Sequence, residues 1–232
     1  MGGEEFRVLG PLEVRRAGQV LDLGRPKQRA VLAVLLIEAN RVVALDRLID
    51  LLWGDEPPPR AIGALQVYIS GLRRVLEPLR PARSPAQVLI TQPPGYVLRL
   101  DPAQLDACQF EARAAHGHNL LVEGRPTAAA QALTEALDLW RGPAYADFAF
   151  EPFAQTEAAR LEELRAVAVE DRIAAELVLG NHLAVTAELE SLVAAHPLRE
   201  RLWAQLMLAL YRSERQSEAL RAYERARTVL AE

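Results

Sequence analysis

Arginine residues stand at both ends of a stretch of small side chains between positions 60 and 74. Arg60 and Arg74 can pair with phosphate oxygens, while Gly63 and Ser70 between them leave room for close approach of a ligand. Apolar residues recur in the same stretch at steps of three and four, which predicts a helix over residues 61–79 with one buried stripe. The stripe positions are Ile62, Leu65, Ile69, Leu72 and Leu76.

The face opposite this stripe is the candidate binding surface. At about 100° per residue it carries cations at its ends and small residues in its middle. Its positions are Arg60, Gly63, Val67, Ser70, Gly71 and Arg74, with Tyr68 and Arg73 on the flanks. Such a face fits the major groove of DNA while arginines hold phosphates on either side. The alternative is an ordinary surface helix whose arginines serve solubility.

Short strands and two further helices are predicted before this segment. Alternating apolar residues between positions 6 and 23, broken by glycine and proline, predict a small antiparallel sheet. Helices are predicted over residues 26–40 and 45–53. The second helix ends at Gly54, because the acidic and proline-rich residues that follow cannot continue it.

A hairpin is predicted after the candidate binding helix. The β-prone runs 88–91 and 96–100 are joined by the Pro-Gly turn of residues 92–95. A sheet, three helices and a hairpin in this order form the winged helix-turn-helix plan. The first hundred residues are therefore predicted to be an α+β winged helix.

Five segments resemble the OmpR-type DNA-binding domain, and more narrowly its version in the Streptomyces antibiotic regulatory protein family. They are residues 26–30 (PKQRA), 48–54 (LIDLLWG), 64–70 (ALQVYIS), 72–74 (LRR) and 93–96 (PPGY). The resemblance implies that the third helix enters the major groove and that the hairpin wing reaches the adjacent minor groove. The contacts it implies are Tyr68, Ser70, Arg73 and Arg74 on the helix and Tyr96 on the wing.

Two positions depart from this family pattern. Relatives commonly have arginine where this chain has Gly71 and, on the wing, Gln92. Without an arginine at this position of the helix, the chain loses a bidentate contact with guanine, which is worth about 1–3 kcal/mol of discrimination against the other bases. Sequence preference then depends more on Val67 against thymine methyl groups and on DNA shape.

The same resemblance implies a transcription activator of a secondary-metabolite (antibiotic) gene cluster. Such regulators bind direct repeats in double-stranded promoter DNA, usually as two protomers side by side. They contact RNA polymerase, including the sigma factor and the C-terminal domain of the alpha subunit. We expect the polymerase contact in the stiff acidic loop between the second and third helices, at Trp53, Asp55 and Glu56.

The second half of the chain is predicted to be all-α. Its helices are expected at residues 105–123, 126–140, 153–179, 183–196, 199–213 and 216–232. An offset of 34 residues aligns Gly180 with Glu214 and Leu189 with Tyr223, which is the tetratricopeptide (TPR) period. The packing positions of that repeat are expected at Trp203, Leu206, Ala209, Leu210, Tyr211, Ala219 and Tyr223. A non-repetitive bundle is the alternative, and the charged residues of 153–179 are expected to form a solvated face.

Segments of this half resemble the bacterial transcriptional activation domain. They are residues 136–143, 157–164, 196–202 and 207–212. The predicted domains are therefore 1–100, a winged helix, and 101–232, a TPR-like helical domain. The last predicted helix lacks a terminating glycine, which leaves open a longer regulator that continues beyond it.

Charge is distributed unequally between the two halves. Residues 1–100 hold 14 Arg and Lys against 10 Asp and Glu, whereas residues 101–232 hold 13 against 21, within a net charge of −4. A basic first half is typical of a chain that meets phosphate there. Ordinary variation between two domains is the alternative explanation.

Signals for catalysis, metal or cofactor binding are weak. Cys108 is the only cysteine, Lys27 the only lysine, and His116 and His118 point to different faces of their predicted helix. We therefore expect no enzymatic activity, no cofactor and no metal, and cytoplasmic localisation without a membrane segment. Two other functions stay open: a TPR-like interaction scaffold, and a repressor that uses the same DNA-binding domain.

Overall fold

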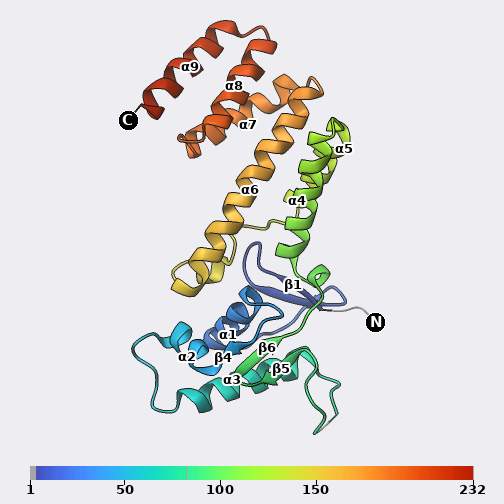
Figure 1. Ribbon diagram of the computed structural model, residues 1–232, viewed down its shortest axis with the longest axis vertical. Coiled ribbons are helices and arrows are strands. Elements are labelled where there is room, and N and C mark those ends of the chain that lie inside the picture. Colours follow the sequence, from blue (N-terminus) through green and yellow to red (C-terminus); the bar gives the residue numbers. More distant parts are fainter. Residues whose placement is uncertain (1–3, 82, 232) are drawn as a thin grey trace. The chain divides into compact units, whose positions relative to one another are not determined.

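The computed structural model describes residues 4–81 and 83–231, which form two compact units (Figure 1). The first unit consists of Met1–Phe110 and Leu139–Glu163, and the second of Glu111–Asp138 and Leu164–Glu232. The α+β class of the first part and the helical class of the second confirm the predicted fold. The division into domains 1–100 and 101–232 stays a prediction.

A three-stranded antiparallel sheet opens the first unit, as predicted. Its strands are β1 (Glu4–Arg7), β2 (Glu13–Arg16) and β3 (Gln19–Val20), in the order β1-β2-β3. Phe6 pairs with Val14, and both side chains are buried. One face of this sheet therefore belongs to the core of the first unit.

Three helices follow the sheet: α1 (Pro26–Ile37), α2 (Leu45–Trp53) and α3 (Ala61–Leu76). The second ends at Gly54 with a positive φ of 57°, as the sequence predicts. The third ends three residues earlier than predicted, because Pro78 disfavours helical geometry at the preceding Glu77, whose ψ is 62°.

The buried stripe of α3 is confirmed at four of its five positions. These are Leu65, Ile69, Leu72 and Leu76. The prediction was wrong at Ile62, which is 49% exposed. Ile62 and Arg73 lie on the same side of α3, about three turns apart. At the C-terminal end of α3 this side is covered, because Arg73 is bonded to strand β5. At the first turn of α3 the same side is not covered, so Ile62 is exposed to solvent.

The predicted hairpin forms a second sheet with a short strand that precedes α2. Its strands are β4 (Val43–Ala44), β5 (Leu89–Gln92) and β6 (Gly95–Leu98), in the order β4-β6-β5. Gly95 lies opposite Ala44, and a Cβ at residue 95 would overlap the carbonyl oxygen of Val43. Only glycine therefore allows β4 and β6 to pair at this distance.

Helices make up the rest of the chain. They are η1 (Pro102–Gln104), α4 (Asp106–Val122), α5 (Pro126–Leu137), η2 (Ala146–Phe148), α6 (Pro152–Val178), α7 (His182–Ala195), α8 (Glu200–Arg212) and α9 (Gln216–Leu230). The six predicted α-helices are confirmed, with ends within a few residues of those expected.

The core of α7, α8 and α9 follows the TPR-like pattern only in part. Trp203, Leu206 and Ala209 are buried as predicted. The prediction was wrong at Tyr211 and Tyr223, which are 62% and 51% exposed. The α9 residues that enter this core are Ala222 and Ala226, so the two tyrosines lie at its margin.

Two acidic residues in the middle of α6 are buried, which corrects the expectation of a solvated face. Glu170 Oε1 lies 2.6 Å from Arg199 Nε, and Arg201 pairs with both Glu170 and Asp171. Nδ1 of His118 lies 2.8 Å from Asp171 Oδ2. Buried carboxylates require such partners, and here they come from α4, from α8 and from the N-cap of α8, distant in the sequence.

Candidate nucleic-acid interface

One long face of α3 is open to solvent. Arg60, at the N-cap, and Val67, Ser70 and Arg74 are all exposed. Gly63 has open space where a Cβ would stand. The predicted arrangement of cations at both ends and small residues between them is therefore present on the folded surface.

The wing is attached to α3 through Arg73. Its Nε donates to the carbonyl oxygen of Leu89 at 2.7 Å, and Nη2 donates to Thr91 Oγ1 at 2.7 Å. Its guanidinium carbon lies 5.9 Å from the ring centroid of Tyr96, which is 7% exposed. Burial lowers the pKa of Arg73, but a guanidinium remains protonated at physiological pH.

Arg73 and Tyr96 thus belong to the joint between helix and wing. Direct DNA contacts by these two residues stay a prediction, and their observed contacts orient β5 and β6 beside α3. Gln92 lies at the exposed end of β5, next to the turn of the wing. A minor-groove contact by Gln92 stays a prediction.

Tyr68 supports the loop between α2 and α3. Its ring lies 6.4 Å from the ring of Trp53, at an interplanar angle of 24°. Lys27 Nζ donates to the carbonyl oxygen of Leu52 at 2.5 Å, which satisfies an acceptor in the last turn of α2. The loop itself exposes both Asp55 and Glu56.

Gly71 is not in the middle of the open face, which corrects its predicted place. A Cβ at Gly71 would overlap the amide group of Gln28 in α1. That amide also donates from Nε2 to the carbonyl oxygen of Leu23 at 2.8 Å. The start of α1 therefore covers this side of α3, and an arginine at position 71 would have to displace Gln28.

The open face is consequently rotated toward Gln66, a residue that sequence reasoning missed. Gln66 is exposed, as are Ile62 and Gly63 before it. The apolar stripe locates the buried side of α3 but does not reveal what covers its flanks. Here Gln28 covers one flank, and the wing covers the other at the C-terminal end.

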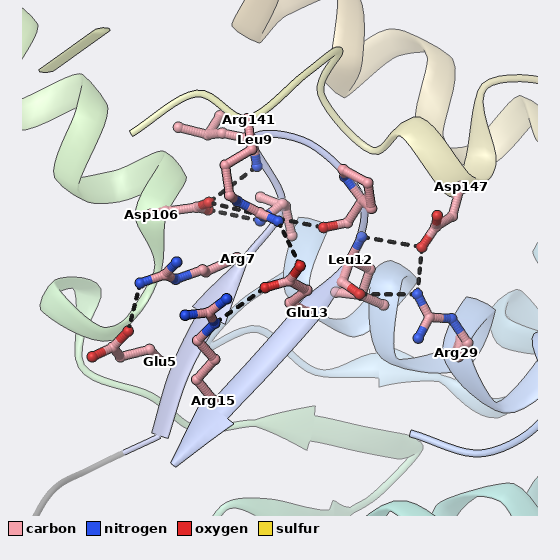
Figure 2. A network of polar contacts seen from close by, with 12 residues as sticks. Glu5, Arg7, Leu9, Leu12, Glu13, Arg15, Arg29, Asp106, Arg141 and Asp147 are labelled. Carbon is pink, nitrogen blue, oxygen red and sulfur yellow. Dashed lines mark hydrogen bonds and ion pairs between the residues drawn. The ribbon is translucent and has the colours of Figure 1, made fainter. Parts of the chain in front are cut away.

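A polar network within the first unit holds the turn between β1 and β2 (Figure 2). Asp106 accepts hydrogen bonds from the backbone amides of Val8 at 2.8 Å and Leu9 at 3.1 Å. Burial raises the pKa of Asp106, although these amides and Arg141 favour its charged form. The carboxylate is thus a buried cap for two amides that lack strand partners.

A second carboxylate of this network connects the turn to α1. Asp147 accepts from the backbone amide of Leu12 at 3.1 Å and pairs with Arg29 (Figure 2). Arg141 pairs with Glu13 at 3.1 Å. Sequence reasoning missed these contacts, because no local pattern connects residues more than a hundred positions apart.

Among residues 4–81 and 83–231, no group of three or more potential metal ligands comes together. The described helices include none that is long and apolar enough to cross a membrane.

A winged helix with an open recognition-type helix, combined with TPR-like helices, defines a class of DNA-binding transcription regulators. Comparison with known families supports this class. Residues 105–232 match the bacterial transcriptional activator domain, and residues 18–98 match the C-terminal domain of transcriptional regulatory proteins. The chain belongs to the Streptomyces antibiotic regulatory protein family of transcription regulators.

Individual relatives match 97–100% of the chain. The chain is 39% identical over 229 residues to the regulatory protein DnrI of Streptomyces peucetius. This match covers 97% of the chain and 84% of DnrI. It is 42% identical over 232 residues to the regulatory protein AfsR of Streptomyces coelicolor, of which it spans only 22%. It is 41% identical over 228 residues to the transcriptional regulatory protein EmbR of Mycobacterium tuberculosis, of which it spans 58%.

A solved structure agrees with the fold. Mycobacterium tuberculosis EmbR, in complex with a low-affinity phosphopeptide, superposes with a TM-score of 0.93 at 40% identity. The similarity covers 100% of this chain and 60% of that one.

Proposed function

We propose that this chain activates transcription by binding direct repeats in double-stranded promoter DNA and recruiting RNA polymerase. The observation that carries the proposal is the open face of α3, with exposed Arg60 and Arg74 at its ends and the small residues Gly63 and Ser70 among those between them. Phosphate contacts at both ends place such a helix in the major groove, where base edges can be read. The wing, attached through Arg73, supplies the second contact.

DNA binding is tested with footprints and gel shifts on promoter regions next to the protein's own gene, across a salt series. We expect protection of short direct repeats and a steep loss of affinity with salt. Arg60→Ala and Arg74→Ala should each reduce the salt slope by about one, whereas the control Arg227→Ala should leave it unchanged. Arg227 is an exposed arginine of α9 that pairs with Glu224. A folded protein that protects no DNA at low salt would contradict the proposal.

The loop between α2 and α3 is proposed as the polymerase contact, toward the sigma factor or the alpha C-terminal domain. Asp55 and Glu56 are exposed on this loop, and Trp53 anchors its base against Tyr68. The double variant Asp55→Arg/Glu56→Arg should retain DNA binding and lose activation in purified run-off transcription. If activation is unchanged in this variant, the polymerase does not contact this loop.

Two protomers side by side on each pair of repeats complete the proposal. Destroying one repeat should then lower occupancy of the other, as measured by footprint titration. The family suggests targets in a secondary-metabolite (antibiotic) gene cluster, which transcript profiling of a deletion strain tests. Run-off transcription also distinguishes activation from repression, since both need the same groove contacts.

A second candidate function, protein interaction through the helical unit, is favoured by exposed apolar residues on α8 and α9. Tyr211 is 62% exposed, Leu220 68% and Tyr223 51%. A contiguous apolar surface of this kind would mark an interaction site. A scaffold role alone would be favoured if the folded chain bound no DNA.

A further inference from the structure

Gln66 is an amide side chain on the open face of α3 that makes no hydrogen bond with any residue in the described parts of the chain. At about 100° per residue it lies about 40° from Ser70 and about 60° from Gly63 around the helix. Val67, the next residue, is 67% exposed. These four residues form one continuous surface, which we call the readout patch.

The surroundings of Gln66 leave space for a base pair. Gly63 has no Cβ, and nothing lies within 4 Å of where one would stand. Ser70, one turn later, has a short side chain. Side chains flanking Gln66 along the helix therefore do not prevent its amide from reaching the floor of a groove.

The arginines of α3 are placed away from the readout patch. Arg60 and Arg74 stand at the two ends of the open face, where phosphates are expected. Arg73 is engaged by Leu89, Thr91 and the ring of Tyr96. None of these arginines therefore stands at the centre of the open face, where it could make a bidentate contact with guanine.

A glutamine amide has the opposite preference to arginine. Its NH₂ group donates to adenine N7, and its oxygen accepts from the adenine N6 amino group, an arrangement that only adenine satisfies in the major groove. Valine contributes an apolar contact with the C5-methyl group of thymine. The chemistry of Gln66 and Val67 together matches an A·T pair.

We propose that Gln66 reads adenine in the major groove and, with Val67, selects an A·T pair at the centre of each half-site. This proposal rests on the DNA-binding function proposed above. It identifies Gln66 as a specificity-determining residue and gives the sequence class of the site it reads.

The test begins with selection of binding sites from random duplex DNA by the full chain. Single base-pair changes and 7-deazaadenine, which lacks the N7 acceptor, are then introduced at each adenine of the selected site. For the wild type, replacing the central adenine by guanine should weaken binding about 5- to 150-fold. Replacement by 7-deazaadenine should also weaken binding at that position.

Variants at Gln66 assign the effect to this side chain. Gln66→Ala should bind adenine and 7-deazaadenine duplexes within about twofold of each other, since no bidentate partner remains. Its preference for adenine over guanine should fall to about fourfold, which is what the contact of Val67 with the thymine methyl group supplies. Gln66→Arg should prefer guanine, and Gln66→Glu should prefer cytosine on the same strand. The control Gln155→Ala changes another exposed helical glutamine, in α6, and should keep the wild-type preference.

Two results overturn different parts of the reasoning. If Gln66→Ala discriminates against 7-deazaadenine at the central position as strongly as the wild type does, Gln66 does not read that adenine and the inference fails while DNA binding stands. If the wild type selects no sequence and binds without salt dependence, the proposed DNA-binding function itself fails. Alanine is a better helix former than glutamine, so the alanine variant should keep its fold, which circular dichroism checks.

Discussion

Gly95 is the residue on which the pairing of β4 with β6 depends most directly. A Cβ there would overlap the carbonyl oxygen of Val43 and lie 2.7 Å from its carbonyl carbon and 2.8 Å from the Cα of Ala44. All three are backbone atoms, so no side-chain rotation can relieve the overlap. Gly95→Ala must therefore move β4 or β6, the strand that carries Tyr96 beneath Arg73.

The expected cost follows from this geometry. Overpacking by one methyl group in a well-packed region costs about 1–3 kcal/mol, and a backbone obstacle places the change toward the upper part of that range. We expect a lower midpoint of denaturant unfolding with little change in its slope. The midpoint of thermal unfolding should fall by about 4–12 °C. DNA affinity should fall as well, because the wing shifts relative to α3.

Gly63→Ala is the matched control. Its Cβ would meet nothing within 4 Å, and the residue lies inside α3. Replacing glycine by alanine inside a helix stabilises by about 0.5–1 kcal/mol. The two substitutions add the same methyl group and should change the free energy of unfolding in opposite directions. If the unfolding midpoint of Gly95→Ala is unchanged, the backbone at Val43 can move aside without a cost in stability, and the reasoning is refuted.

Three further predictions concern the groove, the turn and the buried acids. Deoxyuridine in place of the central thymine should weaken wild-type binding about fourfold and leave the affinity of Val67→Ala unchanged, as measured by gel shift. Asp106→Ala should cost about 1–3 kcal/mol for each amide left unsatisfied, as measured by denaturant unfolding. Because its folded pKa is raised, the stability that Asp106 contributes is present in full below its unfolded pKa and decreases as pH rises through the folded value. Arg201→Ala should cost about 1–3 kcal/mol, because Glu170 and Asp171 are buried but each keeps another partner.

Each of these has a result that would count against it. If deoxyuridine weakens binding of the wild type and of Val67→Ala equally, Val67 does not contact the thymine methyl group. A cost of Asp106→Ala that grows with pH would show that the hydrogen bonds and Arg141 outweigh burial. Unchanged stability of Arg201→Ala, compared with the exposed control Arg227→Ala, would indicate that water replaces Arg201 beside Asp171.

Local patterns in the sequence were sufficient to predict the α-helices and the wing hairpin, but not the two-residue strand β4. The spacing of Leu65, Ile69 and Leu72 located both the third helix and its buried side. Gly54 and the prolines after it predicted the end of α2, and the turn 92–95 predicted the wing. These features depend on dihedral preference and on the period of apolar residues, which a short window of sequence contains.

The composition of the open face was only partly predictable. Arg60, Val67, Ser70 and Arg74 are exposed as expected. Gly71 was misplaced, because its side of α3 is covered by Gln28, more than forty residues earlier in the chain. Which flank of a helix stays open depends on neighbours that its own periodicity does not specify.

By itself, the sequence determined the order of the α-helices and of the wing hairpin, most of the buried side of α3, and the family to which the chain belongs. Only the tertiary structure decided that Arg73 holds the wing, that Gln66 faces outward, and that Asp106 caps the turn between β1 and β2. The physical reason is the range of the interactions. Dihedral and hydrophobic preferences act within a few residues, whereas hydrogen bonds and ion pairs join whichever groups packing brings together.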